Sequence, residues 1–316
     1  MHRFVVCAFL LACGLPAHAE TIADGIELVP GEFRPGPQPD GNSILFHTTT
    51  GLVVFDTGRH ATHTQQVLDA AHAAHQPIVA VINSHWHLDH IGGNARIRAA
   101  YPSVHVYASN ALADARSGFL ANYRHQLEGA IAQSTDANQQ QVYRDEIALI
   151  DAGDALAPDR VVRGDQTLRI GGRKLELHVS RHSVTAGDVW LFDPATHTLV
   201  AGDLVTLPAP LFDTACPARW STALAQLDRV DFTRLVPGHG KPMTHAQLTT
   251  YRQAFDHLLA CAASTSPKAQ CADGWIADAG PLLAGGDRAF ARSLLDYYLD
   301  QSLRGDPKKA AALCGT

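Results

Sequence analysis

The sequence predicts a single α/β domain in which two β-sheets pack face to face with helices on their outer faces, an αββα sandwich. Strand and helix patterns alternate along the first half of the 316-residue chain, and a second series of strands followed by helices makes up the other half. No internal repeat or low-complexity linker separates the halves. Each sheet must bury an apolar face, and two similar halves do so by packing together.

The first half contains the most clearly patterned strands. Two β-branched runs, at 51–56 and 78–83, are of the kind buried inside a sheet. Between them, apolar side chains recur at helical spacing from His63 to His75. The expected elements of this half are strand 51–56, helix 63–75, strand 78–83, helix 94–100 and strand 104–108.

Two mainly helical segments extend the sandwich. Residues 109–151 are rich in Ala, Gln and Arg and predict a helical insertion of two helices, broken near 134–136. Residues 244–316 predict a C-terminal helical extension. The other expected elements are strands 166–170, 174–180, 189–192 and 198–201 and helices 217–230, 244–261 and 288–303.

Residues 1–19 have the pattern of a signal peptide. A short polar start precedes an apolar run from Phe4 to Leu15, and Ala17-His18-Ala19 provides a cleavage pattern of small residues. The run is shorter than the roughly 20 residues that span a membrane. Leu10-Leu11-Ala12-Cys13 also resembles a lipobox, which is the lipoprotein alternative. We expect cleavage near Ala19, a domain of residues 20–316, no stable membrane anchor, and a periplasmic or secreted location.

The cysteines after the signal peptide agree with an oxidising compartment. Four remain, an even number, and no C-x-x-C pattern suggests a metal site. Three pairings are possible. Cys261 and Cys271 are ten positions apart between two helical patterns, so we favour Cys261–Cys271 together with Cys216–Cys314.

The composition excludes several classes of protein. Hydrophobic residues make up 46% of the chain and charged residues 18%, which is typical of a globular domain and rules out disorder. The formal net charge is -6, whereas nucleic acids and anionic membranes bind basic surfaces. A small-molecule substrate is therefore the expected partner. The composition leaves the oligomeric state open.

The strongest chemical signal is Ser84-His85-Trp86-His87-Leu88-Asp89-His90, which follows a buried strand and precedes Gly92-Gly93. Four side chains able to bind metal lie within six residues. Neutral imidazole and carboxylate are the ligands that Zn²⁺ prefers. This loop can direct two side chains to each of two adjacent sites.

The H-x-H-x-D-H pattern after a hydrophobic strand resembles the metallo-β-lactamase superfamily. Its other motifs occur in the family order: Asp56-Thr57-Gly58 at a strand end, His182 after a later strand, Ala201-Gly202-Asp203, and Pro237-Gly238-His239-Gly240. The resemblance spans residues 56–240. It implies the metallo-β-lactamase fold and a dinuclear metal site.

The resemblance to glyoxalase II, a member of this superfamily, implies a ligand set. One zinc takes His85, His87 and His182; the other takes Asp89, His90 and His239; Asp203 bridges them. Asp89 is also the expected catalytic residue that orients the attacking hydroxide, and Asp56 is expected to hold a ligand in place. Two zinc ions are the expected cofactors, with iron as an alternative.

One stretch departs from the family pattern. Four residues separate His182 from the following Gly-Asp, where many members have two. His178 is an alternative ligand, but it lies inside a strand. The insertion also lengthens the gap between His90 and His182, and such an insertion commonly packs over the site and shapes the substrate pocket.

The resemblance implies an exported dinuclear zinc hydrolase that uses a metal-bridging hydroxide on an ester, thioester or amide carbonyl. Two Zn²⁺ outweigh Asp89 and Asp203, so the pocket should attract anionic substrates. The similarity is greatest to periplasmic SoxH-like metallohydrolases of quinoprotein systems. Two alternatives are a β-lactamase, in which a bridging aspartate like Asp203 is unusual, and a mononuclear iron enzyme like the persulfide dioxygenases.

Other residues near the motifs are expected to have structural roles or to contact substrate. His60 and His63 follow the Asp56-Thr57-Gly58 turn and either contact substrate or begin a solvated helix. Trp86 is expected to pack rather than touch substrate. Ser183 beside His182 is not expected to be a nucleophile, because adjacent side chains at a strand end diverge.

Overall fold

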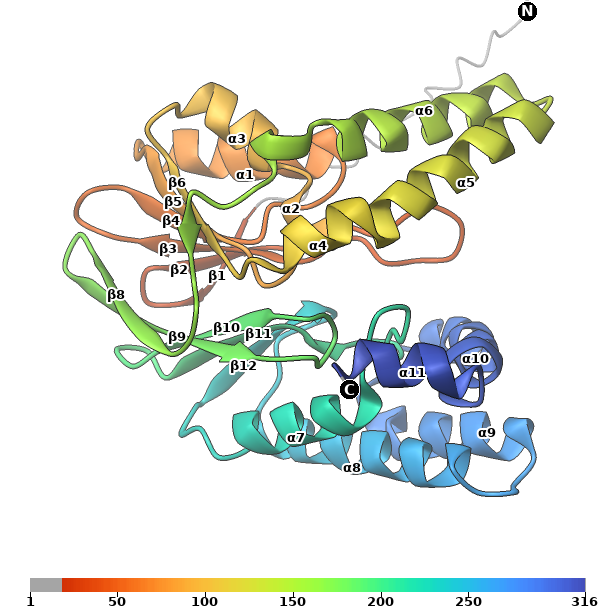
Figure 1. Cartoon of the computed structure of the whole chain (residues 1–316). Helices are drawn as coiled ribbons and strands as arrows, with labels where there is room; N and C mark the ends of the chain where they lie inside the picture. Colours follow the sequence, from red (N-terminus) through yellow and green to blue (C-terminus); the bar gives the residue numbers. More distant parts are fainter. Residues whose placement is uncertain (1–18, 316) are drawn as a thin grey trace, which may run out of the picture.

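Two β-sheets lie face to face between two layers of helices in the computed structural model, which describes residues 19–315 (Figure 1). This arrangement confirms the αββα sandwich. The predicted signal peptide, apart from Ala19, lies outside the described residues. Within the described part of the chain, no helix is long and apolar enough to cross a membrane.

The first sheet has seven strands in sequence order. Strands β1 to β4 are antiparallel, and β4 to β7 are parallel. The patterned runs became β4, β5 and β6, whereas β1 to β3 and the two-residue β7 were not predicted. The strands are β1(Glu20–Ala23), β2(Ile26–Val29), β3(Ser43–His47), β4(Leu52–Phe55), β5(Ile78–Ile82), β6(His105–Ala108) and β7(Arg160–Val161).

The second sheet has five strands in the order β12-β11-β10-β9-β8. Strands β8 to β11 are antiparallel, and β12 is parallel to β11. All nine residues of β11 are buried. This strand runs five residues beyond the predicted end at Ala201. The strands are β8(Gln166–Ile170), β9(Arg173–Ser180), β10(Asp188–Asp193), β11(Thr198–Thr206) and β12(Arg234–His239).

The hydrophobic core between the sheets fixes how the two sheets lie against each other. Phe46 and Phe55 of the first sheet pack with Leu177 and Leu191 of the second, and none of the four is exposed. Strand residues alternate between faces, so the opposite faces contact the outer helices. Trp220 and Phe255 form part of the core beneath the second sheet. These buried faces hold the strand ends, where the candidate site lies, in fixed positions.

Apart from the single turn α2, the helices form four groups (Figure 1). Helices α1 and α3 cover the first sheet, and α7 and α8 cover the second. Helices α4 to α6 form the predicted insertion, and α9 to α11 follow α8. The helices are α1(Ala61–Ala73), α2(Leu88–Ile91), α3(Asn94–Ala100), α4(Ala111–Ser117), α5(Phe119–Gln133), α6(Ala137–Asp151), α7(Pro217–Leu227), α8(His245–Ala262), α9(Lys268–Asp278), α10(Asp287–Tyr298) and α11(Pro307–Leu313); short helical turns occupy Gly153–Ala155, Gly280–Leu282 and Leu299–Leu303.

Two disulfides stabilise the C-terminal helices. Cys216 pairs with Cys314, and Cys261 pairs with Cys271, which confirms both favoured pairings. The first joins residues 98 positions apart and links the end of α11 to the start of α7. It therefore holds the C-terminal segment against the second sheet.

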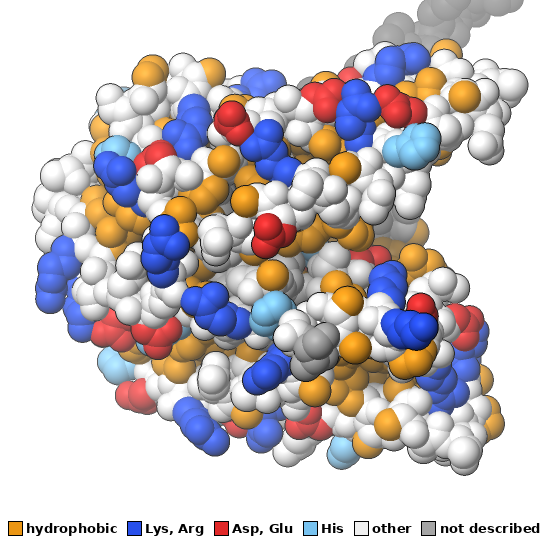
Figure 2. Space-filling view, viewed as in Figure 1, with side chains coloured by type: hydrophobic (Ala, Val, Ile, Leu, Met, Phe, Trp, Pro, Cys, Tyr) orange, Lys and Arg blue, Asp and Glu red, His pale blue; other side chains and the backbone are white. Residues whose placement is uncertain are grey.

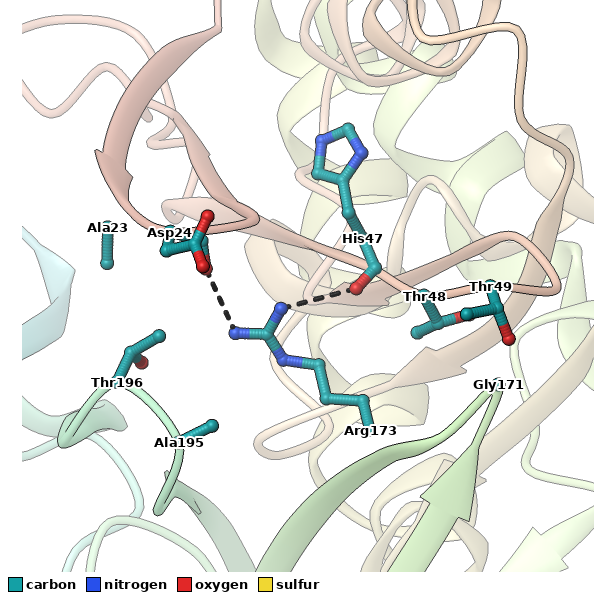
Figure 3. A pocket seen from close by; sticks show the side chains of 9 residues that line it. All are labelled: Ala23, Asp24, His47, Thr48, Thr49, Gly171, Arg173, Ala195 and Thr196. Carbon is teal, nitrogen blue, oxygen red and sulfur yellow. Dashed lines mark hydrogen bonds between the residues drawn. The ribbon is translucent and has the colours of Figure 1, made fainter.

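A hollow of about 540 Å³ lies where the loops of both sheets meet (Figure 3). Arg173 of β9 crosses it and donates to the backbone oxygens of Gly25 and His47 in the first sheet. Its guanidinium also pairs with Asp193 of the second sheet, 2.6 Å away. Arg173 therefore links the two sheets, and we assign this hollow a structural role.

Candidate metal centre

Six of the seven predicted ligands come together beside three strands, β5, β11 and β12. His85 and His87 lie in the loop after β5, and Asp89 and His90 lie on the single turn α2 that follows. Asp203 comes from β11, and His239 ends β12. One loop therefore supplies four of the six, and the second sheet supplies the other two.

The six side chains form two groups that share Asp203. The four-ligand group contains Asp89, His90, Asp203 and His239, and the three-ligand group contains His85, His87 and Asp203; within each group the candidate ligand atoms lie within 4.8 Å of one another. Asp203 turns one oxygen to each group. Its Oδ1 is 3.2 Å from His90 Nε2, and its Oδ2 is 3.8 Å from His85 Nε2. This arrangement suits a carboxylate that bridges two cations.

The buried polar atoms of these groups fit a metal better than they fit one another. His85 Nε2, His90 Nε2 and both carboxylate oxygens of Asp203 are buried and make no hydrogen bond, although they lie close together. A buried polar atom without a partner costs about 1–3 kcal/mol. Cations at the shared positions would satisfy these atoms together. The residues present therefore fit a divalent metal centre.

Glycine backbones provide the space around these ligands. A Cβ added at Gly238 would lie 2.0 Å from Asp203 Oδ1, and one at Gly41 would lie 2.5 Å from the His90 ring. Any side chain at either position would push a ligand out of place. Gly238 of the Pro237-Gly238-His239-Gly240 motif therefore leaves room for the Asp203 carboxylate as well as forming part of the turn.

Asp56 orients two of the histidines. Its carboxylate lies 2.8 Å from His90 Nδ1 and accepts hydrogen bonds from the Ser84 backbone and hydroxyl, each at 2.7 Å. The Ser84 oxygen in turn lies 2.9 Å from His85 Nδ1. Both Nδ1 atoms therefore carry the proton, which leaves each Nε2 lone pair free for a metal. Asp56 has φ 59°, a left-handed conformation that aspartate tolerates better than most residues.

Thr214 orients His87 through the opposite ring nitrogen. The Thr214 hydroxyl donates to the Val184 carbonyl oxygen at 2.9 Å, so its own oxygen accepts from His87 Nε2, also at 2.9 Å. This pattern leaves His87 Nδ1 as the unprotonated nitrogen. Thr214 was not predicted from the sequence, because it lies 127 positions from His87 in an irregular loop with no motif.

Burial and nearby charges shift the pKa values of these histidines in opposite directions. Burial lowers the pKa of His85 and of His87, which favours the neutral imidazole that binds metal. Burial also opposes a charge on His90, but the carboxylates of Asp203, Asp89 and Asp56 outweigh it and raise the pKa of His90 well above its usual range. Conversely, His90 holds the pKa of Asp89 well below its usual range despite burial. Without metal, a proton on His90 balances these carboxylates.

The structure does not bring His182, the seventh predicted ligand, to either group. Its ring lies against the C-terminal segment, where Nδ1 contacts the Leu313 backbone oxygen at 3.2 Å. Four residues separate His182 from Gly187, and of these Val184 packs into the core. The alternative ligand His178 stacks on Trp190 at 4.0 Å and contacts Asp165. The longer spacing after His182 therefore coincides with the absence of this histidine from both ligand groups.

A pocket of about 350 Å³ opens onto the centre. His87 and Asp89 line it, and its walls come largely from the loop of residues 33–39, the insertion and α10. Figure 2 shows the surface hollowed between the insertion and the C-terminal helices, with hydrophobic side chains in the hollow. The aromatic residues that line it are Phe33, Trp86, Phe119, Tyr123, Phe290 and Tyr298. Trp86 both packs on Phe119, 5.3 Å away, and reaches the pocket.

Arg59 connects the insertion to a candidate ligand. It is buried, pairs with Glu146 of α6, and lies 3.6 Å from Asp89 Oδ1. Burial opposes its charge, but Glu146 and Asp89 outweigh this effect and raise the pKa of Arg59. Arg59 was not predicted from the sequence, although it directly follows the Asp56-Thr57-Gly58 motif. Arg59 therefore links α6 of the insertion to Asp89 of the metal centre.

Other residues near the pocket were either missed or assigned elsewhere. Asp213 lines the pocket and accepts a hydrogen bond from Tyr298 at 2.5 Å, a pair without any signal in the sequence. His60 contacts Asp40 at 2.8 Å, and His63 contacts Ser43 at 2.8 Å. Neither histidine is among the residues that line the pocket. We therefore assign both to local structure rather than to substrate contact.

Comparison with known proteins agrees with the fold. A model of the metallo-beta-lactamase superfamily matches residues 36–265. The chain therefore belongs to the metallo-β-lactamase superfamily. It has a candidate metal centre formed by Asp203, His239 and residues of the H-x-H-x-D-H loop.

The similar proteins of known activity cover only part of the chain. A linear primary-alkylsulfatase of Pseudomonas sp. (strain ATCC 19151) is 24% identical over 222 residues, 63% of this chain and 41% of that enzyme. An (R)-specific secondary-alkylsulfatase of Pseudomonas sp. is 32% identical over 33% of this chain and 16% of that enzyme. A hydroxyacylglutathione hydrolase of Gloeobacter violaceus is 46% identical over 21% of this chain and 31% of that enzyme. The chain thus spans less than half the length of these relatives.

Solved structures show the same fold at low sequence identity. A stereoselective inverting sec-alkylsulfatase from Pseudomonas sp. superposes with a TM-score of 0.61 at 19% identity, and the match covers 92% of this chain and 51% of that chain. A metallo-beta-lactamase from Pontibacter korlensis gives 0.55 at 21% identity, over 76% of this chain and 98% of that chain. At these identities, the likeness concerns the fold alone.

Proposed function

We propose that the protein is an exported hydrolase that holds two zinc ions and cleaves an ester, thioester or amide bond of a small anionic substrate. The observation that carries this proposal is Asp203, whose two buried oxygens make no hydrogen bond and face two separate groups of histidines. A carboxylate placed in this way suits a dinuclear centre. Iron is an alternative metal, because imidazole and carboxylate bind it as well.

The chain's own residues hold and orient the reacting groups. Two divalent cations would lower the pKa of water and polarise the bond to be cleaved. Asp89 lines the pocket, and one of its oxygens faces His239 while the other faces Arg59. Its carboxylate, which stays ionised because its pKa is held low, is therefore positioned to orient a water molecule or hydroxide in the pocket. The Asp56 contacts keep the histidine rings in place during turnover.

The pocket supports a substrate with an apolar part and a charged end. Its aromatic walls would bind the apolar part, and two cations would attract the anionic end because Asp89 and Asp203 cancel only half of their charge. Asp213 lies in the same pocket. Its carboxylate favours a hydrogen-bond donor on the substrate beside the anionic group.

Sulfate esters are a second candidate substrate class. The likeness to two alkylsulfatases and the apolar pocket above the centre favour them. The likeness to hydroxyacylglutathione hydrolase favours a thioester instead. The motifs are also compatible with a β-lactamase and with an iron enzyme that oxidises persulfides, and a substrate panel distinguishes all of these.

Export is supported by the two disulfides, because such bonds persist in oxidising compartments. The signal pattern at residues 1–19 supports the same location. We propose that the mature protein acts in the periplasm or outside the cell.

Metal analysis of the purified protein, combined with a substrate panel, tests the proposal. The panel contains an aryl ester, a glutathione thioester, an alkyl sulfate, a chromogenic cephalosporin and a persulfide. We expect zinc and turnover of a thioester or ester. Iron together with oxygen uptake on the persulfide would refute the hydrolase. Turnover of the cephalosporin alone would assign β-lactams as the substrate. Turnover of the alkyl sulfate alone would assign sulfate esters.

A further inference from the structure

The two halves of the centre have unequal ligand sets. Apart from the shared Asp203, the four-ligand group has three residues of its own, Asp89, His90 and His239. The three-ligand group has only His85 and His87. One half therefore has one more ligand and one more carboxylate charge than the other.

Neighbouring residues do not make up the difference within the described part of the chain. His182 faces the Leu313 backbone oxygen, and the C-terminal segment packs against its ring. Thr214 is close to His87, but its hydroxyl hydrogen goes to Val184 and its oxygen accepts from His87 Nε2. Thr214 thus positions His87, and it is not a free ligand.

The disulfide Cys216–Cys314 fixes this difference in the fold. The Cys216 backbone donates to the Ser183 oxygen at 2.8 Å, so the loop that carries Thr214 is tied to the residues after His182. Cys314 in turn holds the end of α11, whose Leu313 oxygen contacts His182. The segment that covers His182 and the loop that supports His87 are therefore one covalently linked unit.

Ligand number and charge largely set the affinity of a site for a divalent cation. Loss of a residue that merely supports a ligand costs 10–100-fold in affinity. Loss of a whole ligand together with a carboxylate charge should cost more. Because His87 lines the pocket, the open positions of the weaker half face the substrate.

We propose that the four-ligand half binds its metal tightly, whereas the three-ligand half binds a second metal at least ~100-fold more weakly and leaves positions open for the anionic group of the substrate. This inference rests on the proposed function, because both require the centre to hold metal. It adds that the protein retains one metal when free metal is scarce.

The test is a Zn²⁺ titration of the metal-stripped, disulfide-bonded protein by isothermal titration calorimetry, with zinc counted after dialysis against metal-free buffer. We expect two binding events that differ at least ~100-fold in affinity, and about one zinc retained per chain. Two retained zincs of equal affinity would overturn the inference while leaving the dinuclear proposal intact. Absence of any zinc binding would refute the proposed function itself.

Three variants assign the events. His87→Ala should remove only the weak event, and His239→Ala should remove the tight one. His182→Ala is the matched control, since its ring lies outside both groups, and it should leave both events unchanged. Loss of the weak event in His182→Ala would identify His182 as a ligand and contradict the assignment. The wild-type titration decides the question even if a variant fails to fold.

Discussion

The four-ligand and three-ligand halves of the centre are built from the same loop but supported differently. In the four-ligand half, His90 is held by buried Asp56, and Asp203 and His239 come from two adjacent buried strands. In the three-ligand half, His87 depends on Thr214, which lies in an irregular loop linked to the C-terminus by a disulfide. Asp56 also supports His85 of the three-ligand half through Ser84, so the two halves differ mainly in His87, whose support is a disulfide-linked loop.

This contrast shows how a family motif can be present while its site has changed. The sequence contains a histidine after β9, as the family pattern requires, yet four residues then separate it from Gly187-Asp188. That spacing places Val184 in the core and His182 against the C-terminal segment. The position of a ligand depends on the loop that carries it as much as on its identity.

The largest expected effect comes from removing the residue that both halves share. Asp203→Ala should lower kcat/KM by about 10⁴-fold, because it removes a ligand from each half at once. Retained zinc should fall below one per chain. Metal analysis and steady-state kinetics on the substrate found by the panel measure both quantities. Undiminished activity would contradict the assignment of Asp203 as the bridge.

Removal of Cys216–Cys314 tests the covalent support of the three-ligand half. In the chain-entropy treatment, a loop of 98 residues contributes about 4.7 kcal/mol to stability and a loop of 10 residues about 2.7 kcal/mol. The double variant Cys216→Ser/Cys314→Ser should therefore lose more unfolding free energy than Cys261→Ser/Cys271→Ser. Urea denaturation compares them. We also expect only the first pair to weaken the second zinc-binding event, and equal zinc binding in both would sink this part of the account.

Asp56→Asn tests the carboxylate that supports His90 of the four-ligand half directly and His85 of the other half through Ser84. Asparagine tolerates the left-handed backbone but accepts fewer hydrogen bonds, so His90 and Ser84 lose part of their anchor. The affinity of the tight site should fall about 10–100-fold. The control is Asp165→Asn, since Asp165 is exposed and contacts only His178 among the histidines. A tight site of unchanged affinity in Asp56→Asn would show that the backbone alone orients His90.

A separate prediction concerns the turn whose Val184 carbonyl oxygen accepts from Thr214. Asp188 is buried, and burial raises its pKa to about 7 although hydrogen bonds from Thr185 and Val184 oppose the shift. The folded chain then keeps a proton that the unfolded chain releases above its usual pKa of 3.8. This contribution to stability is full below about pH 4 and is lost as the pH rises toward 7.

The comparison variant for this turn is Asp188→Asn, which cannot titrate. The unfolding free energy of wild type minus that of the variant should fall between pH 4 and pH 7. Urea denaturation of the metal-stripped proteins at several pH values measures the difference. A difference that does not change with pH would mean that Asp188 is ionised in the fold throughout.

The sequence predicted the sandwich because its central strands are continuous β-branched runs. It predicted six side chains of the centre because they belong to short motifs at strand ends, as Asp89 and His239 do. It missed β1 and β7, which are short and partly exposed and therefore carry no clear period. It also missed Thr214 and Arg59, whose roles depend on contacts between distant segments. Local pattern determines which residues are available, and long-range packing determines which of them meet.

The most direct test of the unequal centre is an anomalous-diffraction map of crystals soaked in low and then high zinc. We predict one strong peak among Asp89, His90, Asp203 and His239 at low zinc, and a second peak beside His85 and His87 only at high zinc. His182 should stay against Leu313 in both maps. Two equal peaks at low zinc, or a zinc ion coordinated by His182, would contradict the account.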